Sequence, residues 1–316
     1  MESDGRYGAA MDIGLHLPSA GPGVTSESIR TVATRAEELG FETLWFFDHL
    51  FTPSDLDSKY PYSRDGSYAV SPNDPFFDPL GLYGYLAGAT SSIKMCSGVL
   101  IPAYRHPIVL AKTLATIENL APGRVVLGVG TGWMREEFDA VGVGFDKRGA
   151  RLDEYIQALR AIWSPEPSAF EGAFYSWPRG GFLPAPTTKI PIVVGGHSER
   201  ALRRAARLGD GWAGVTGKGQ GSGLDALAAR IETLDGYLSG YGRSRDGFTI
   251  SYQNVLWFSD DVNPKLPFTG PPEAIASAIE RAQEIGVTML DLVVFGPPDL
   301  IVETAERFMK EVKPLL

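Results

Sequence analysis

An acid and an imidazole stand side by side where an apolar stretch of this chain ends. Thr43–Phe51 reads TLWFFDHLF, so Asp48 and His49 close an apolar run that a long polar, proline-rich segment follows. In a barrel of parallel strands, catalytic side chains sit where strands end and loops begin. Histidine exchanges protons near neutral pH, so this pair is the first candidate for acid–base chemistry. The alternative is that Asp48 caps the next segment and His49 is a wall residue; consecutive strand residues face opposite sides, so Asp48 is structural unless the strand bends.

The other histidines follow the same rule of position. The sequence has four histidines, and each falls at or just after the end of an expected strand: His16, His49, His106 and His197. Imidazole is a common metal ligand, which raises the possibility of a metal site. A metal-dependent hydrolase barrel would place His-x-His on the first strand and an acid at the end of the eighth, and neither is present. We therefore expect no metal; unrelated polar residues on one rim are the remaining alternative.

Glycines gather at two of the expected strand ends and occur within a third expected strand. A glycine-rich turn before a helix lets backbone approach a ligand, and a serine hydroxyl with free N–H groups offers an anion site. This description fits Gly195, Gly196, His197 and Ser198, although Ser198 could act as a helix cap alone.

A second group follows the fourth expected strand, as Gly128, Gly130, Thr131, Gly132 and Trp133. Beside the broad indole ring, these glycines suggest a wall for a planar ligand, whereas a tight turn would explain them equally. Within the third expected strand, Gly98 and Val99 indicate either a bulge with close backbone approach or plain packing.

Hydrophobic periodicity predicts the elements that carry these residues. Short apolar strands alternate with amphipathic helices along the whole chain. The expected strands are 11–17, 42–47, 93–101, 124–130, 190–194, 212–215, 248–258 and 288–295. This alternation predicts an α/β fold, a (β/α)8 TIM barrel, as one domain over residues 1–316. An open doubly wound sheet is the alternative, but the turn after the first strand lacks GxGxxG.

Two insertions interrupt the alternation. Residues 50–75 follow the second strand and form what we call the lid loop; a loop this long without secondary structure is commonly functional. The aromatic residues in or next to this loop indicate that it forms a lid that covers a bound substrate. They are Phe51, Tyr60, Tyr62, Tyr68, Phe76 and Phe77. The second insertion, residues 164–189 before the fifth barrel strand, is rich in proline and aromatics and suggests a hairpin.

Composition limits the partners. The formal net charge is −9, which argues against a nucleic-acid-binding surface. Cys96 is the single cysteine, so no intrachain disulfide is expected and a reducing compartment is favoured. The first residues lack an apolar core of signal-peptide length, and no apolar run approaches the ~18 residues of a membrane span. A soluble, cytoplasmic protein without a membrane or nucleic-acid partner is expected.

With these segments identified, the chain resembles the bacterial luciferase-like monooxygenase superfamily, and within it the coenzyme F420-dependent oxidoreductases. The matching words are RAEELGFETLWFFDHL, SGVLIPAYRHPIVLAKTLATIENLAPGRVVLGVGTGWMREEFDAVGV, FDKRGARLDEYIQALRAIW and VVGGHSERALRRAARLGDGW. They cover about residues 11–212. The resemblance implies a TIM-type barrel, usually homodimeric, that binds FMN or the deazaflavin F420 across the carboxyl-terminal rim of the strands.

The resemblance also implies roles for individual residues. Asp48 and His49 match the family's Asp-His pair, whose histidine lies near the reactive carbon of F420. Gly98 and Val99 match a segment where a non-proline cis peptide supports the cofactor ring. The segment cradling the ribityl-phosphate side matches Gly195, Gly196, His197 and Ser198. Where sugar-phosphate-oxidising members carry a proton-donating glutamate, this chain has Trp133, with Glu136 and Glu137 a turn later.

The functional expectation is hydride transfer between F420 and a small organic substrate, with His49 supplying or accepting the accompanying proton. Arg105 and Arg148 are candidates for the cofactor's anionic tail, with surface solvation as the alternative. Two other functions stay open: an FMN-dependent monooxygenase of the same superfamily, and a non-catalytic flavin-binding barrel. The sequence does not identify the substrate or the direction of hydride transfer.

Overall fold

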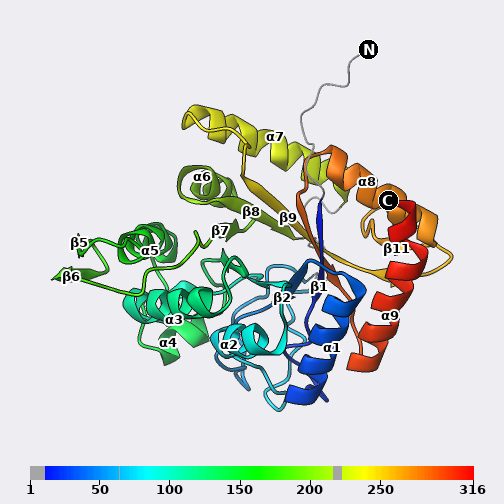
Figure 1. Ribbon diagram of the computed structural model, residues 1–316, viewed down its shortest axis with the longest axis horizontal. Coiled ribbons are helices and arrows are strands. Elements are labelled where there is room, and N and C mark those ends of the chain that lie inside the picture. Colours follow the sequence, from blue (N-terminus) through cyan, green and yellow to red (C-terminus); the bar gives the residue numbers. More distant parts are fainter. Residues whose placement is uncertain (1–10, 64, 216–222) are drawn as a thin grey trace.

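The computed structural model describes residues 11–63, 65–215 and 223–316. Parallel strands close into a barrel in the order β1-β12-β9-β8-β7-β4-β3-β2 (Figure 1). Their bounds are β1 (Asp12–His16), β2 (Thr43–Phe46), β3 (Lys94–Ser97), β4 (Val125–Val129), β7 (Ile192–Gly195), β8 (Gly211–Val215), β9 (Thr249–Val255) and β12 (Met289–Val293). Each one falls within or beside an expected strand, so the predicted (β/α)8 barrel is confirmed.

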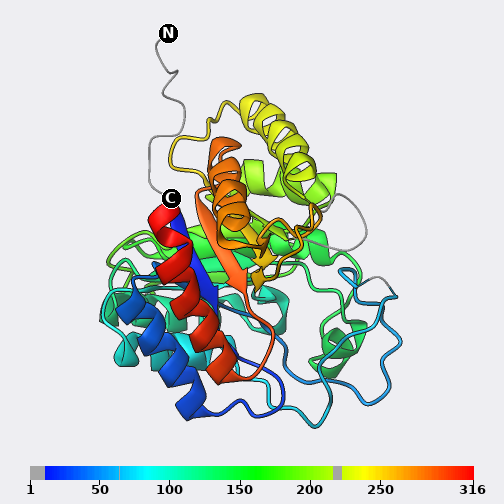
Figure 2. The same cartoon turned by 90° about the vertical axis from the view of Figure 1, so that its right-hand side faces the viewer.

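Helices surround the barrel and connect consecutive strands, and α9 packs beside α1 (Figures 1 and 2). The helices are α1 (Ser26–Leu39), α2 (Pro79–Ala89), α3 (Pro107–Leu120), α4 (Arg135–Ala140), α5 (Arg148–Ile162), α6 (Glu199–Leu208), α7 (Leu224–Gly240), α8 (Pro272–Glu284) and α9 (Pro298–Glu311), with short 3-10 turns η1 (Pro102–Tyr104) and η2 (Lys313–Leu315). Their ends carry ordinary signals: Thr25 caps α1, Gly40 ends it with φ 89°, and Pro107 opens α3. Among the helices described, none is long and apolar enough to cross a membrane.

The structure contains the expected hairpin and also some short elements that the sequence did not predict. The second insertion contains the predicted hairpin, an antiparallel pair of β5 (Ser168–Glu171) and β6 (Ser176–Gly180). The short helix α4 was not predicted, nor was the parallel pairing of β10 (Trp257–Phe258) with β11 (Thr269–Gly270). The expected strand 248–258 contains both β9 and β10, because an unbroken apolar sequence joins them.

The barrel interior changes from apolar to polar toward the carboxyl-terminal ends of the strands, which we call the mouth. An apolar layer fills the interior, made of Trp45, Cys96, Val126, Val193 and Met289. Register partners in parallel strands face the same side, so His16, the partner of Trp45, also faces inward. Asp291 lies two residues beyond Met289, and its partner on β9 is Gln253. A polar layer therefore separates the packed core from the mouth.

Candidate active site

His49 lies at the mouth and is held by a buried carboxylate. Its Nδ1 is 2.8 Å from Glu137 Oε2, and Glu137, on α4, is fully buried. The same carboxylate accepts hydrogen bonds from the backbone N–H of Leu50 at 2.6 Å and from the hydroxyl of Tyr104 at 2.8 Å. With Nδ1 occupied, the ring presents Nε2 as the nitrogen for proton exchange. The sequence located His49 and named Glu137, but did not pair them.

Asp48 makes a separate set of contacts. Its carboxylate pairs with Arg105 in a two-point arrangement, with N···O distances of 2.7 and 2.9 Å, and accepts a backbone hydrogen bond from Ile101 at 2.8 Å. Arg105 also reaches Asp78, at 2.5 Å. Burial raises the pKa of Asp48 above its ordinary value, while the hydrogen bonds and charge of Arg105 oppose that shift. These contacts tie the end of β2 and the start of α2 to the segment after β3, and none joins Asp48 to His49.

Aromatic side chains of the lid loop crowd around His49. The ring centroids of Tyr68 and Phe76 lie 5.1 and 5.3 Å from that of His49, and Trp133 lies 5.8 Å away. Tyr60 packs against Trp133 at 5.1 Å, and burial raises its pKa to about 12, so its hydroxyl stays protonated. These contacts place apolar ring surface around the histidine and confirm that the lid loop crosses the mouth.

The lid loop is anchored on the same helix that supplies Glu137. The neighbouring carboxylate, Glu136, accepts backbone hydrogen bonds from Asp57 at 2.9 Å and Ser58 at 3.0 Å. The Ser58 hydroxyl oxygen in turn accepts from the backbone N–H of Arg135. One short helix thus positions both the imidazole and the loop above it.

Val99 and the surrounding glycines form one packed unit. The peptide bond between Gly98 and Val99 is cis, as the resemblance implied. A Cβ added at Gly130 would lie 2.5 Å from Val99 Cγ2, and one at Gly195 would lie 2.8 Å from Val99 Cγ1. These two glycines therefore make room for the valine side chain. This packing explains them before any ligand is invoked, and it shapes the wall next to β3.

The loop after β4 continues this wall. Thr131 is half-buried, and Gly132 has φ 76°. A Cβ on Gly132 would meet Phe138 at 2.7 Å, so glycine is required there by both conformation and space. Arg148 donates from Nε to the Gly132 carbonyl at 3.1 Å, and its guanidinium covers the Phe145 ring. Of the two arginines considered for an anionic tail, Arg105 is committed to carboxylates and Arg148 to this loop.

The turn after β7 combines a cap with an unpartnered imidazole. Ser198 accepts from the backbone N–H of Ala201 at 3.2 Å and so caps α6, while Gly196 has φ 120°. His197 Nε2 accepts from the backbone N–H of Val215 at 3.3 Å, and its Nδ1 is buried without a partner among the described residues. Burial and the nearby charge of Arg230 lower the pKa of His197 to about 4. The ring is therefore neutral, with Nδ1–H as an unused donor.

A further acid, missed by the sequence reasoning, lies inside the barrel. Only the end of the eighth strand was inspected, whereas Asp291 lies in the middle of β12 and is 1% exposed. Its carboxylate oxygens are 3.0 and 3.2 Å from His16 Nδ1. An aspartate flanked by Leu290 and Leu292 in a buried strand was the available signal, because alternation turns it toward the interior. The remaining histidine, His106, is exposed and caps α3.

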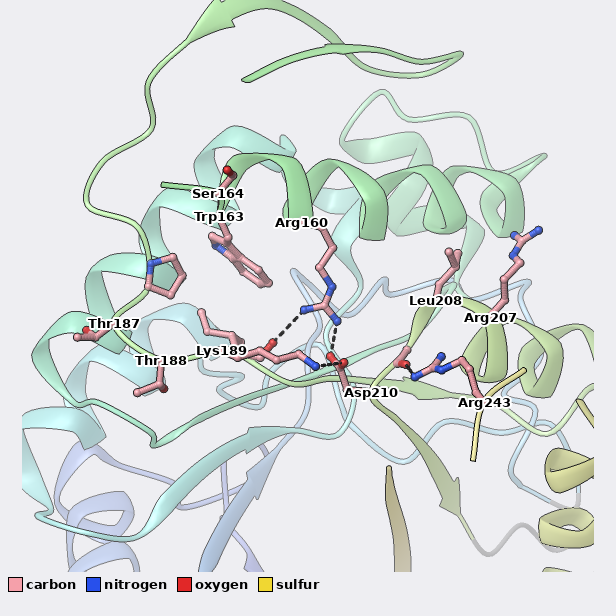
Figure 3. A pocket seen from close by; sticks show the side chains of 13 residues that line it. Arg160, Trp163, Ser164, Thr187, Thr188, Lys189, Arg207, Leu208, Asp210 and Arg243 are labelled. Carbon is pink, nitrogen blue, oxygen red and sulfur yellow. Dashed lines mark hydrogen bonds and ion pairs between the residues drawn. The ribbon is translucent and has the colours of Figure 1, made fainter. Parts of the chain in front are cut away.

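A cavity of about 580 Å³ lies away from the mouth, where β7 and β8 begin (Figure 3). Arg160 and Lys189 both point at Asp210 there, and the Lys189 Nζ distance is 2.5 Å. Arg243 donates to the Ala206 and Gly209 carbonyls at the end of α6. These cations are engaged in holding helices to strands, so the cavity is a structural junction.

Comparison with known proteins places the chain in context. Residues 11–263 match the family model described as luciferase-like monooxygenase. An uncharacterized protein of Mycobacterium tuberculosis is 39% identical over 203 residues, covering 64% of this chain and 69% of the relative. The F420-dependent glucose-6-phosphate dehydrogenase of Microbacterium testaceum is 34% identical over 217 residues, covering 67% of this chain and 58% of that protein.

Solved structures show the same architecture. An F420-dependent secondary alcohol dehydrogenase, in complex with an F420-acetone adduct, superposes with a TM-score of 0.77 at 18% identity, covering 98% of this chain and 100% of that one. The monooxygenase RslO1 from Streptomyces bottropensis superposes with a TM-score of 0.76 at 21% identity, covering 96% of this chain and 99% of that one. At these identities the similarity concerns the fold.

Proposed function

Because the chain belongs to the luciferase-like monooxygenase family, we propose that it is an oxidoreductase that transfers a hydride between coenzyme F420 and a small organic substrate. The observation that carries this proposal is His49 at the mouth, held through Nδ1 by the buried carboxylate of Glu137 and enclosed by aromatic rings. The identity to F420-dependent glucose-6-phosphate dehydrogenase supports F420 as the cofactor.

The residues at the mouth fit a flat cofactor with polar edges. Gly98 and Val99 would support the ring, and the loop of Gly130, Thr131 and Gly132 would form its wall. The turn of Gly195, Gly196, His197 and Ser198 would hold the side chain of the cofactor. His197 supports this assignment because its buried Nδ1–H lacks a partner within the described part of the chain and would suit an oxygen acceptor. When bound, F420 supplies or accepts the hydride.

The residues of this chain manage the accompanying proton and the solvent. His49 exchanges a proton through Nε2, since Glu137 fixes its ring orientation. Tyr68 of the lid loop and Phe76 directly after it exclude water by covering the histidine. Asp48 acts as a positioning residue, because its carboxylate is committed to Arg105. Trp133 occupies the position of the proton-donating glutamate, which argues against sugar-phosphate oxidation.

The second candidate is an FMN-dependent monooxygenase, which the family description and the structural similarity to a monooxygenase favour. A flavin-binding barrel without catalysis is the third. We also propose that the protein works as a homodimer in the cytoplasm, as the resemblance and the single buried thiol of Cys96 suggest. Analytical ultracentrifugation tests the dimer, and a sedimentation coefficient of a monomer at micromolar concentration would contradict it.

The decisive experiment is a parallel titration of cofactor-free protein with F420 and with FMN, followed by absorbance and fluorescence. We expect F420 to bind at least about tenfold tighter, a difference of ~1.4 kcal/mol. A tenfold preference for FMN, with oxygen consumption, would replace this proposal by the monooxygenase. Equal binding of cofactor without turnover on any substrate would favour the non-catalytic barrel.

A matched pair of variants tests the role of His49. His49→Gln should bind F420 normally and lose about 100-fold or more in turnover, the usual effect of removing a general acid–base group. His106→Asn is the control, because asparagine can still cap α3 and the exposed His106 ring packs against Tyr175. Equal turnover in the two variants would exclude proton exchange by His49.

A further inference from the structure

A second imidazole lies in the polar layer of the barrel, and the function proposed above does not use it. His16 is the last residue of β1 and is 7% exposed. Its Nδ1 faces the carboxylate of Asp291, at 3.0 and 3.2 Å from the two oxygens. Its Nε2, across the ring, is buried and has no hydrogen-bond partner in the described part of the chain. A buried polar atom without a partner is uncommon and calls for a ligand or another explanation.

The imidazole is held rigidly in this orientation. Gln253 donates from Nε2 to Asp291 Oδ2 at 2.6 Å, so the carboxylate is fixed from β9 as well. The ring of Phe47 lies 4.0 Å from that of His16, centroid to centroid. The carboxylate assigns the Nδ1 proton, so Nε2 is an acceptor when the ring is neutral and a donor when it is protonated. This arrangement of a carboxylate, an imidazole and an unpartnered second ring nitrogen is the general geometry of an acid–base group.

The polar layer also borders the expected position of the cofactor ring. A Cβ built on Gly98 would lie 3.8 Å from Asp291 Oδ2 and 3.0 Å from the Trp45 ring. The Asp291 carboxylate is therefore packed directly against the backbone of Gly98 at the base of the mouth. One carboxylate thus contacts both the segment expected to support the cofactor ring and the Nδ1 of His16.

We propose that His16 binds the oxygen atom of the substrate through Nε2 and exchanges a proton with it, and that the substrate is an alcohol or the corresponding carbonyl compound. This inference rests on the proposed function, which supplies the deazaflavin as hydride acceptor or donor. In the oxidative direction the C–H bond breaks and its electron pair leaves as hydride to the deazaflavin. The O–H bond breaks, its proton moves to Nε2, and the C=O double bond forms. Reduction of a carbonyl follows the reverse path.

The chemistry of the polar layer selects this class of substrate. An alcohol can donate a hydrogen bond through its O–H, whereas its carbonyl product can only accept one. Nε2 of His16 accepts a hydrogen bond while the ring is neutral and donates one after it has taken up the proton, so it matches both the alcohol and the carbonyl. An ammonium substrate would need a carboxylate oxygen, but both oxygens of Asp291 already face His16 and one also accepts from Gln253. The negative charge of Asp291 disfavours a carboxylate or phosphate at the same point. His49 is then left to serve the cofactor side of the reaction.

The first test measures contact without turnover. Protein labelled with ¹⁵N-histidine contains four histidines, and the His16 resonances are assigned by their loss in His16→Asn. We expect the Nε2 resonance of His16 to shift on addition of at least one of 2-propanol, cyclohexanol and 1-phenylethanol. Ethylbenzene, which has the frame of 1-phenylethanol without its hydroxyl, should leave the resonance unmoved. No response to any alcohol, or an equal response to ethylbenzene, would overturn the proposal.

The second test uses the F420-loaded protein and a selective variant. Asparagine at position 16 can place its amide nitrogen near the position of Nδ1, so His16→Asn keeps a donor for Asp291 and deletes Nε2. We expect unchanged F420 affinity within about twofold, and a loss of at least about 100-fold in kcat/KM for the alcohol. Retained turnover would overturn the role of His16. If F420 alone shifts the resonance and alcohols add nothing, the nitrogen belongs to the cofactor and the substrate assignment is wrong.

The two proposals fail in different ways. If neither cofactor preference nor F420 binding is found, the proposed function fails, whereas the alcohol titration of the cofactor-free protein still reports on His16. If F420 binds tightly and the alcohols do not reach Nε2, the further inference alone fails. Should His16→Asn not fold, the resonance test on the wild-type protein decides the question by itself, with assignment from a His49→Gln, His106→Asn and His197→Gln set.

Discussion

The buried pair of Asp48 and Arg105 makes a quantitative prediction about stability. The side chain of Asp48 is 0% exposed and that of Arg105 is 10% exposed. Arg105→Met removes the cation and leaves a buried carboxylate with only the backbone N–H of Ile101. Removing one partner of a buried ion pair costs about 3–5 kcal/mol, because the other charge stays desolvated. We therefore expect Arg105→Met to lower the free energy of unfolding by about that amount, measured by urea denaturation.

The chain contains a matched control on its surface. Arg35 also contacts two carboxylates, Glu38 and Glu306, but its side chain is 40% exposed and theirs are 63% and 46% exposed. Exposed pairs contribute about 0–1 kcal/mol, so Arg35→Met should be nearly neutral. Equal losses in Arg105→Met and Arg35→Met would refute the argument from burial.

A double variant separates a structural from a catalytic Asp48. Asp48→Asn combined with Arg105→Met removes both charges, and the amide oxygen can still accept from Ile101. The double variant should lose less stability than the sum of the single changes, and it should recover turnover along with stability. If Asp48 itself reacted with substrate or cofactor, the double variant would fold and remain inactive. Additive losses would show that the two side chains do not interact.

Three further predictions address the site. Gly130→Ala should cost about 1–3 kcal/mol of stability by overpacking, since its Cβ would lie 2.5 Å from a valine methyl, whereas Gly88→Ala meets nothing within 4 Å and should be neutral or stabilising, both measured by urea denaturation. Glu137→Gln and Glu118→Gln each alter a fully buried carboxylate and should each cost about 1–3 kcal/mol, yet only Glu137→Gln should also lower turnover, by about 100-fold. The pKa of His197 is lowered from 6.5 to about 4 in the folded protein, so the unfolded chain binds this proton first as the pH falls. The free energy of unfolding should therefore decrease by about 3 kcal/mol between pH 6.5 and 4. His197→Gln should show a smaller decrease when the two proteins are compared by urea denaturation at pH 7, 5 and 4.

The architecture was predictable because its signals are local. Each strand is a short apolar run, each helix shows its own periodicity, and punctuation such as Gly40 and Pro107 marks their ends. Helix α4 escaped prediction because it has only six residues, most of them polar, and no side-chain cap. The β10–β11 pair escaped because it joins two-residue segments far apart in sequence, which carry no periodic pattern.

The glycines show a different limit of sequence reasoning. Gly195 was expected to let backbone approach a ligand and Gly130 to form part of a wall for a planar ligand, and the structure adds a packing role around Val99 for both. A glycine in a sequence indicates only that a side chain is disfavoured at that position. What the Cβ would meet depends on neighbouring segments, and here the segment after β3 supplies Val99, which lies far from both glycines in the sequence.

The acid–base groups of the site follow from topology and could not be paired from sequence. His49 and Glu137 are 88 residues apart, and His16 and Asp291 are 275 apart. In each case the histidine lies at or just after the end of a barrel strand, as the sequence indicated. The carboxylate comes from an element whose position only the closed barrel determines. For Asp291 that closure is the parallel pairing of β1 with β12, which brings the first and last strands together. A residue at a strand end can therefore be nominated from sequence, but the partner that fixes its tautomer must be found in the folded barrel, and that partner decides whether the imidazole can carry a proton.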